Sequence, residues 1–395
     1  MLSVADPDSG VDVLHVAFGG LGGHAPVVTT LTKQLSLAGI RSGVITYAER
    51  TALEANTGAW SDVQVIHPIE LKGRLDLVAW RRIFRIVRDL KPRVVILHTL
   101  KLAVPTKVAL QSMRRTSSTC LLIEHQAIDL RSISYNALSA LALPLVEAVV
   151  YLSDDYKRRY PFRHWPLSAI RHAVVIPNGV ETAEFSPSSR PQERHGVRIG
   201  MASRLTSNKD FQTLIRAVSE LKRSVPTRSI RLDIAGDGPT LPDLLSLVDR
   251  LGLNSEVVFV GHVQGSDLTA FYRKLDVYVQ STYGETASTA ILQAMATGLP
   301  VVGSDVNGVN DLVQHGKTGL LVAPKDPIEM AMAIGELLDD QSQRVRLGAA
   351  GRAEVVAHFG ANKIAEAYLR LFASIDIAGP WAGLVGCTAE VSDSA

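Results

Sequence analysis

Hydrophobic residues along the chain follow two spacings, short β-branched runs and longer stretches with helical periodicity. In the first half, the short runs predict strands over 13–20, 42–48, 63–68, 93–99, 120–126, 148–153 and 173–179. Helical spacing predicts helices over 27–38, 76–90, 105–114 and 137–146. Strands that alternate with helices of this length are typical of a parallel, doubly wound sheet.

The same alternation starts again near Val197. In this half, strands are predicted over 198–205, 230–236, 257–263, 277–282, 299–305 and 318–324, with helices between them, the first over 211–224. The pattern therefore predicts two α/β domains of the same kind.

Pro, Gly and Ser concentrate in 176–196, which marks the boundary between the two series. We expect one Rossmann-like domain over 1–178 and a second over 179–375. The last helix, 361–375, is expected to pack back on the first domain, and 376–395 has no periodicity and predicts a loose tail.

Composition adds limits to this picture. The chain has 395 residues, of which 46% are hydrophobic and 20% charged, and this excludes a disordered or fibrous protein. Its two cysteines, Cys120 and Cys387, cannot form a disulfide framework, so a reducing compartment fits best. No signal peptide or bilayer-spanning stretch is apparent. We expect a cytoplasmic enzyme.

Charge is distributed unevenly. Residues 1–178 hold 21 Lys and Arg against 14 Asp and Glu, a balance of +7, whereas 179–395 hold 20 against 25, a balance of −5. A basic first half suits an anionic partner such as a membrane surface, an acidic acceptor or a phosphate. A solvated charged face explains it equally well, and nucleic acid is not expected as a partner.

Open parallel sheets bind ligands at the carboxyl ends of their strands, so reactive groups are expected at strand ends. Glycines in 18–26 follow the first strand, and their amides can approach a phosphate at a helix N-terminus. The same glycines are compatible with a simple turn. Their spacing is not GxGxxG, which counts against a dehydrogenase.

Two cations, Arg204 and Lys209, lie in the loop after the first strand of the second domain. Arg binds phosphate oxygens bidentately and Lys adds a point charge, so the pair suits a diphosphate, although exposed cations in a loop are usually solvated. Farther on, Glu285 ends a loop, and 286–296 predicts a helix whose N-terminus can hold an anion. The segment is also compatible with a buried βαβ unit.

Taken together and in their order along the chain, these motifs give the sequence a resemblance to the family-4 glycosyltransferases of the GT-B fold. The motifs are GG before the first helix, IPNGV (176–180), RLxxxK (204–209), AGDGP (235–239), FVGHV (259–263), E-x7-Q-AMAxGLPVV (285–302) and HGKTGLLV (315–322). The resemblance implies an α/β protein of two doubly wound Rossmann-like domains that face each other across a cleft. It also implies a nucleoside diphosphate sugar as donor.

The resemblance implies roles for individual residues. Arg204 and Lys209 match the pair that holds the donor diphosphate and neutralises the leaving group without a metal. The only D-x-D motif lies at 6–8, so neither a metal nor another cofactor is expected. Glu285 matches the glutamate beside the donor sugar. The other donor-contacting positions implied are Gly22, Gly23, Gly236, Val263, Gln293 and the amides of Thr286, Ala287 and Ser288.

His125, at the end of a first-domain strand, matches a histidine that reaches the donor sugar and phosphate across the cleft. It is expected to be catalytic, although a lone histidine at a strand end is more often structural. His98 also ends a strand and is less well placed by the pattern.

Two departures from the family pattern concern the donor. Gln293 stands where a glutamate usually binds the ribose hydroxyls, and an amide can still make hydrogen bonds there. Thr286 replaces the usual glycine and Ala287 a frequent aromatic residue, and both changes reshape the sugar pocket. An acidic residue usual after the first GG is also missing, because Ala25 and Pro26 stand there.

We therefore expect a retaining, metal-independent transferase that moves a sugar to a hydroxyl of a sugar, glycolipid or other acceptor, in bacterial cell-surface polysaccharide, glycolipid or glycoconjugate synthesis. Two alternatives stay open, a nucleotide-sugar epimerase of the same architecture and a non-catalytic relic that Gln293 would mark. A basic helix with Trp80, Arg81, Arg82, Phe84 and Arg85 suits an anionic acceptor or the inner membrane face, or else has core aromatic residues and solvated arginines.

Overall fold

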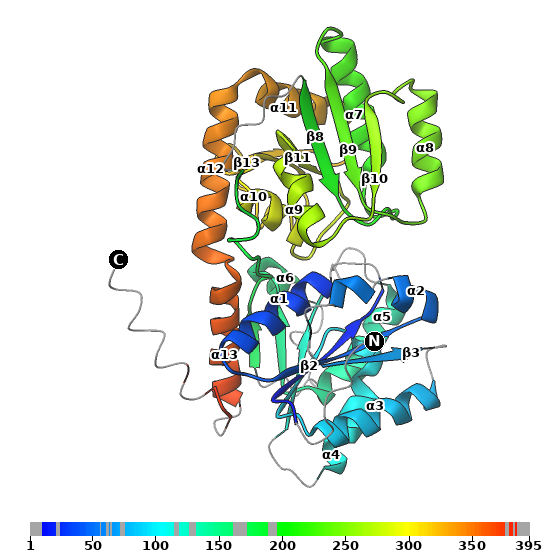
Figure 1. The fold of residues 1–395 in the computed structure, drawn as a ribbon, viewed down its shortest axis with the longest axis vertical. Coiled ribbons are helices and arrows are strands. Elements are labelled where there is room, and N and C mark those ends of the chain that lie inside the picture. The colour runs from blue at the N-terminus through cyan, green and yellow to red at the C-terminus, as the bar shows by residue number, and fades with distance from the viewer. Residues whose placement is uncertain are drawn as a thin grey trace, which may run out of the picture. The chain divides into compact units, whose positions relative to one another are not determined.

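The computed structural model describes residues 10–20, 24–55, 57–60, 63, 65–71, 76–113, 118–125, 132–160, 172–188, 196–375, 379–381 and 384. The chain divides into two compact units (Figure 1). Unit 1 comprises Met1–Gly179 together with Ala361–Ala395, and unit 2 comprises Val180–Gly360. The division falls one residue after the expected position 178.

Unit 1 is built on a parallel sheet with the strand order β3-β2-β1-β4-β5-β6-β7. Its strands are β1 (Val13–Phe18), β2 (Ser42–Ala48), β3 (Ile66–Glu70), β4 (Val94–Leu97), β5 (Thr119–Ile123), β6 (Ala148–Tyr151) and β7 (His172–Val175). Its helices are α1 (His24–Leu37), α2 (Arg50–Ala55), α3 (Leu77–Leu90), α4 (Ala103–Ser112), α5 (Ile133–Ala142), α6 (Asp154–Arg159) and α13 (Ala361–Ile375). The order reverses between β1 and β4, which makes that edge the switch point of unit 1.

Unit 2 repeats the plan with the strand order β10-β9-β8-β11-β12-β13. Its strands are β8 (Val197–Ala202), β9 (Ile230–Ala235), β10 (Val257–Gly261), β11 (Val277–Gln280), β12 (Val301–Ser304) and β13 (Gly319–Val322). Its helices are α7 (Phe211–Ser224), α8 (Leu241–Arg250), α9 (Gly265–Arg273), α10 (Thr289–Ala296), α11 (Pro327–Asp339) and α12 (Gln341–His358). Here the switch point lies between β8 and β11.

Each sheet is covered by apolar packing on both faces, as a parallel sheet requires. In unit 2, one core joins the strands to α7, α8 and α11. A second core joins them to α9 and α10. In unit 1, a large core includes α3 and α4, and a smaller one includes α1. Alternate residues of a strand point to opposite faces, so both sets of positions are apolar.

Several boundaries differ from the predicted ones for local reasons. Strands end earlier than predicted where polar or glycine residues begin the following loop; β11 stops at Gln280, for example. The helix predicted over 137–146 covers Ile133–Ala142 instead, because Ser132 caps its first turn and Pro144 follows in a 3-10 turn. The α7 bounds agree with the prediction.

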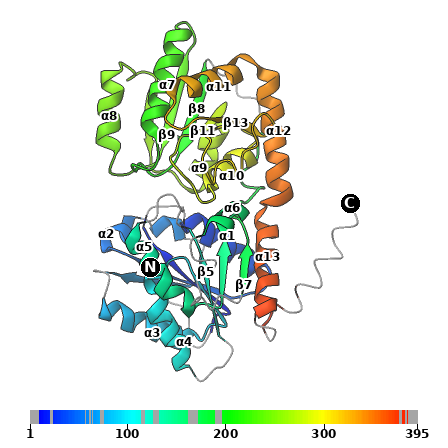
Figure 2. The same ribbon diagram turned by 180° about the vertical axis from the view of Figure 1, so that it is seen from behind.

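Helix α13 belongs to unit 1, where it packs against α1 (Figure 2). Beyond it, Trp381 is fully buried, and its ring lies 5.2 Å from that of Phe372, centroid to centroid. The absence of periodicity in 376–395 therefore did not reveal this buried tryptophan. Among the helices that the structure describes, none is both long and apolar enough to cross a membrane.

Candidate functional site

The switch point of unit 2 collects the residues that were singled out from the sequence. Arg204 and Lys209 lie in the loop that follows β8, and Glu285 lies in the loop that follows β11. Because β8 and β11 are neighbours in the sheet, these two loops leave the same carboxyl edge side by side. This is where an open α/β sheet binds ligands.

Lys209 and Glu285 form an ion pair across these loops, from Nζ to Oε1. Their side chains are only 13% and 12% exposed, so little solvent screens the pair. The backbone of Lys209 forms an isolated antiparallel β-bridge with that of Thr282. The next residue, Asp210, is the N-cap of α7 and accepts a hydrogen bond from Thr213 N. The cation is therefore fixed by the helix that begins directly after it.

Two further side chains, Gln280 and Tyr278, hold the Glu285 carboxylate through buried hydrogen bonds. Gln280 Nε2 donates to Glu285 Oε1 at 2.8 Å, and the Tyr278 hydroxyl donates to Gln280 Oε1 at 2.7 Å. Gln280 and Tyr278 are fully buried, and burial raises the pKa of Tyr278, so its hydroxyl stays protonated. The sequence interpretation missed Gln280; its signal was a polar residue at the carboxyl end of an apolar strand.

The backbone of Glu285 is also fixed. Its amide donates to Asn307 O at 3.1 Å, and Gly308 packs directly against its carbonyl. Gly308 has φ +78°, and a Cβ built there would lie 2.3 Å from Glu285 O. Only glycine fits this position. Gly308 is a second residue that the sequence interpretation missed, and one glycine in VNGVN carries no distinguishing signal.

The loop after β8 is packed against the loop after β9. Gly236, with φ +142°, approaches Ser203 so closely that a Cβ would lie 2.0 Å from the Ser203 carbonyl oxygen. Arg204 follows Ser203, is exposed, and makes no ion pair within the described residues. Val263 is half-buried, after Gly261 at the end of β10. All these positions lie at the carboxyl edge of the unit 2 sheet.

The predicted helix over 286–296 begins three residues late, at Thr289. Ser288 is its N-cap, with an extended backbone and a side chain that accepts from Ile291 N, so Thr286 and Ala287 belong to the preceding loop. Gln293 is buried, and its Oε1 accepts a hydrogen bond from the Tyr272 hydroxyl at 3.0 Å. The prediction of a helix start close to Glu285 is therefore wrong.

In unit 1, three histidines meet at the switch point. His125 follows β5, His98 follows β4, and His15 lies within β1. His15 Nδ1 lies 3.1 Å from His98 Nε2, and His98 Nδ1 lies 3.0 Å from His125 Nε2. His125 is thus joined to a buried partner rather than isolated. The sequence interpretation gave His98 less weight and did not consider His15.

Two residues predicted to contact the donor, Gly22 and Gly23, lie outside the described part of the chain. Within the part that is described, no group of three or more His, Cys, Asp or Glu is arranged to hold a metal ion. Metal independence stays a prediction, since it concerns the reaction.

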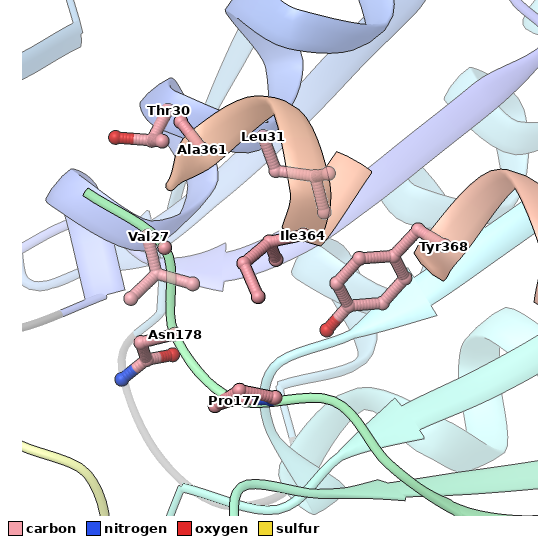
Figure 3. A pocket seen from close by; sticks show the side chains of 9 residues that line it. Val27, Thr30, Leu31, Pro177, Asn178, Ala361, Ile364 and Tyr368 are labelled. Carbon is pink, nitrogen blue, oxygen red and sulfur yellow. The ribbon is translucent and has the colours of Figure 1, made fainter. Parts of the chain in front are cut away.

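A small cavity of unit 1 lies between α1, the segment 177–179 and α13 (Figure 3). Apolar side chains of Val27, Leu31 and Ile364 line it, and the Tyr368 ring points toward it. Its volume is about 10 Å³, room for about one water molecule, so it is a packing defect near the point where the chain leaves unit 1.

Two doubly wound α/β units in tandem, the second with a cation and a carboxylate at its switch point, define the class of GT-B proteins. The solved structures agree with this fold. Alr3699/HepE from Anabaena, crystallised with UDP and glucose, superposes with a TM-score of 0.78 over 92% of this chain and 100% of that chain, at 19% identity. Sucrose-phosphate synthase from Thermosynechococcus elongatus gives 0.72 over 92% and 100%, at 21% identity.

Family models identify the chain more narrowly than the fold does. The model for Glycosyltransferase Family 4 matches residues 21–184, and the model for Glycosyl transferases group 1 matches residues 196–340. The chain belongs to glycosyltransferase family 4. This confirms the resemblance inferred from the motifs, and each matched range covers most of one α/β series.

Curated relatives include a GDP-mannose-dependent alpha-(1-6)-phosphatidylinositol monomannoside mannosyltransferase from Mycobacterium tuberculosis. It is 32% identical over 228 residues, which are 54% of this chain and 58% of the relative. A D-inositol 3-phosphate glycosyltransferase from Corynebacterium efficiens is 34% identical over 200 residues, 47% of each. The chain spans about half the length of the curated relatives it matches.

Proposed function

We propose that this protein is a glycosyltransferase that moves a sugar from a nucleoside diphosphate sugar to an acceptor hydroxyl. The observation that carries the proposal is the meeting of Lys209 and Glu285 at the switch point of unit 2. A cation suits the diphosphate, and a carboxylate suits the hydroxyls of a sugar. Family membership and the names of the relatives point to the same chemistry.

In the proposed reaction, the bond from the anomeric carbon to the diphosphate oxygen breaks, and the acceptor oxygen bonds to that carbon on the same face. The acceptor proton passes to the departing phosphate, and the configuration is retained. Arg204 and Lys209 stabilise the charge that develops on the leaving diphosphate, without a metal ion. Glu285 orients the sugar, and no side chain has to become a covalent nucleophile.

Donor binding by Arg204 can be tested by thermal unfolding with EDTA present, using a panel of nucleoside diphosphates that includes GDP and UDP. At about 100 times Kd, the correct diphosphate is expected to raise the melting temperature by about 5–10 °C. Arg204→Ala should reduce this shift to less than half, because a charge-assisted hydrogen bond is lost.

Arg216→Ala is the matched control, since Arg216 is exposed on α7 and lies outside the loops that carry Arg204, Lys209 and Glu285. A shift that is equal in both variants would contradict the proposed role of Arg204. A shift that is seen only when EDTA is left out would contradict metal-independent binding of the diphosphate. Release of nucleoside diphosphate from GDP-mannose or UDP-glucose, with and without candidate acceptors, then separates a transferase from an epimerase or a non-catalytic relic.

We further propose that the acceptor is anionic or lipid-linked and is met at the inner face of a membrane, as part of bacterial cell-surface polysaccharide, glycolipid or glycoconjugate synthesis. Helix α3 supports this: Leu77 and Val78 are 64% and 76% exposed at its start, and Arg81, Arg82 and Arg85 are exposed behind them. Apolar side chains followed by arginines suit an anionic interface.

Membrane contact is expected to be visible by co-sedimentation with phosphatidylglycerol vesicles and weak with phosphatidylcholine vesicles. Replacing Arg82 and Arg85 together by glutamine should weaken binding about 30-fold, since each basic residue contributes about 1 kcal/mol at such a surface. The control is Arg216→Gln in unit 2. If the double variant binds like the wild type, the arginines are a solvated face and the membrane proposal fails.

A further inference from the structure

Gln280 is an uncharged residue that is fully buried at the end of β11, beside the ion pair of Lys209 and Glu285. Burying an amide costs free energy unless its polar atoms are hydrogen-bonded. Gln280 Nε2 donates to Glu285 Oε1 at 2.8 Å, and Gln280 Oε1 accepts from the Tyr278 hydroxyl at 2.7 Å. Both ends of the buried amide are therefore satisfied, one of them by the candidate site residue Glu285.

Tyr278 is fixed in the core of unit 2. It lies two positions before Gln280 in β11, so both side chains point to the same face of the sheet. That face is covered by α9 and α10, and the Tyr278 ring lies 5.6 Å, centroid to centroid, from the ring of Tyr272 in α9. Burial raises the pKa of Tyr278, so its hydroxyl keeps its proton and can donate a hydrogen bond. The core thus determines where this donor lies.

Only one orientation of the Gln280 amide satisfies both partners. The Glu285 carboxylate is ion-paired with Lys209, and a carboxylate accepts hydrogen bonds without donating any. If the amide were turned over, Gln280 Oε1 would face Glu285 Oε1, and two acceptors would meet with no proton between them. Tyr278 favours the same orientation, because its hydroxyl is bonded to the amide oxygen. The core therefore directs an N–H donor at the carboxylate.

Glu285 is held by two groups that differ in charge. Lys209, in the loop after β8, contacts Glu285 Oε1 through an ammonium, and Gln280, in β11, contacts the same oxygen through a neutral amide. Under the proposed function, a diphosphate at Lys209 competes with Glu285 for the ammonium. A neutral amide whose oxygen is already bonded to Tyr278 is not drawn to that anion. The contact with Gln280 is thus one that a bound diphosphate leaves in place.

We propose that Gln280 is a positioning residue, oriented by Tyr278, which holds the Glu285 carboxylate independently of Lys209 and so keeps it aimed at the donor sugar once the diphosphate is bound. The part of this proposal that concerns the donor rests on the proposed function, and the part that concerns the carboxylate does not. Gln280 acts through Glu285, so the loss of its N–H should reduce turnover and leave diphosphate binding intact.

The contact can be observed by proton–nitrogen correlation NMR of the full chain labelled with 15N in its glutamine side chains, at pH 7.5 and without ligand. An N–H that donates to a carboxylate makes a charge-assisted hydrogen bond, which moves its proton signal downfield. Gln280→Met, of similar size, identifies the Gln280 signals by their loss. If this variant fails to fold, Tyr278→Phe/Gln280→Met serves the same purpose and leaves no tyrosine hydroxyl without its partner.

In the wild type, one Gln280 N–H proton is expected downfield of ordinary glutamine side-chain signals. Glu285→Gln should move it back to the ordinary range, because the charge on the acceptor is removed, whereas Lys209→Met should leave it downfield. A wild-type Gln280 signal in the ordinary range would overturn the proposal, whatever the variants show. A downfield signal that Lys209→Met abolishes would also overturn it, since Gln280 would then depend on Lys209 to hold Glu285.

Adding the nucleoside diphosphate found by thermal unfolding tests the same point with Lys209 present. The downfield Gln280 signal is expected to persist at saturation, and its loss would overturn the proposal. If no diphosphate binds, the proposed function fails, and the Lys209→Met spectrum decides the positioning role by itself.

Turnover gives a readout that a purely structural role would not produce. Gln280→Met is expected to lower kcat about tenfold, the effect of one hydrogen bond to a charged group, with the Kd of the nucleoside diphosphate within about twofold of the wild type. In a Glu285→Gln background, the same replacement should change kcat by less than about twofold, because the charge that Gln280 holds is absent. Equal losses in the two backgrounds would mean that Gln280 acts through packing, which contradicts the positioning role.

Tyr278→Phe tests the orienting role of the hydroxyl. It is expected to lower kcat about threefold, the effect of one neutral hydrogen bond. The double variant Tyr278→Phe/Gln280→Met should be no less active than Gln280→Met, since Tyr278 acts through Gln280. A further loss in the double variant would contradict the proposal that Tyr278 acts by orienting the amide.

Discussion

Replacing Glu285 by glutamine is expected to lower kcat by a factor of about 10²–10³. Glutamine keeps the shape of the side chain and can still accept the hydrogen bond from Gln280 Nε2. It removes the charge that pairs with Lys209 and that we propose orients the donor sugar. The measurement is steady-state turnover of the nucleotide sugar found in the donor screen, with circular dichroism to establish that the variant is folded.

Glu256→Gln is the matched control. Glu256 is also an ion-paired glutamate of unit 2, with its Oε1 2.5 Å from Lys222 Nζ, and it lies at the opposite, amino-terminal end of β10. Its replacement should leave kcat within about twofold of the wild type, since Glu256 lies at the end of the sheet opposite the proposed donor site. If the two variants have equal activity, Glu285 has no part in the chemistry and the proposed site is wrong.

Gly308→Ala is expected to lower the free energy of unfolding by about 2–4 kcal/mol and kcat/KM by about 10²-fold. The new Cβ would lie 2.3 Å from Glu285 O and 2.5 Å from its carbonyl carbon, so the loop that carries Glu285 must shift. A displacement of about 1 Å at a reacting group is enough for a loss of this size. Urea unfolding and steady-state kinetics measure the two effects.

The control for Gly308 is Gly316→Ala. Gly316 has φ +72°, close to the +78° of Gly308, but no atom lies within 4 Å of a Cβ built there. Gly316→Ala should lower the free energy of unfolding by only about 1 kcal/mol, the cost of an alanine in the left-handed region, and should keep the wild-type activity. A Gly308→Ala protein no less active than Gly316→Ala would show that the contact with Glu285 does not position the carboxylate.

Much of the fold was predictable because parallel sheets have a strong local signature. Buried strands such as Ser42–Ala48 and helices such as Phe211–Ser224 agree with their predicted bounds, since apolar runs and helical periodicity arise within a few residues. The family was also predictable, because its motifs lie at strand ends in a fixed order. Boundaries were less predictable where a cap decided them, as Ser288 does for α10.

The candidate site was predictable in its residue types and not in its contacts. Arg204, Lys209 and Glu285 were identifiable as charged residues in loops after strands, but their roles in donor binding stay predictions. Gln280 and Gly308 could not be identified, because a buried glutamine and a loop glycine differ from ordinary residues only through what they touch. Likewise, Trp381 lies in a stretch without periodicity and is buried by Phe372.

Local patterns in the sequence were enough to predict the order of strands and helices, the two-domain plan, the family and the loops in which charged residues gather. Which of these residues meet depends on the folded sheets. Lys209 contacts Glu285 over 76 positions of chain, and His15 contacts His98 over 83. Such pairs follow from strand order and register in a folded sheet. No local pattern predicts them, because periodicity indicates which face of a strand a residue occupies and not which residue is its neighbour on the next strand.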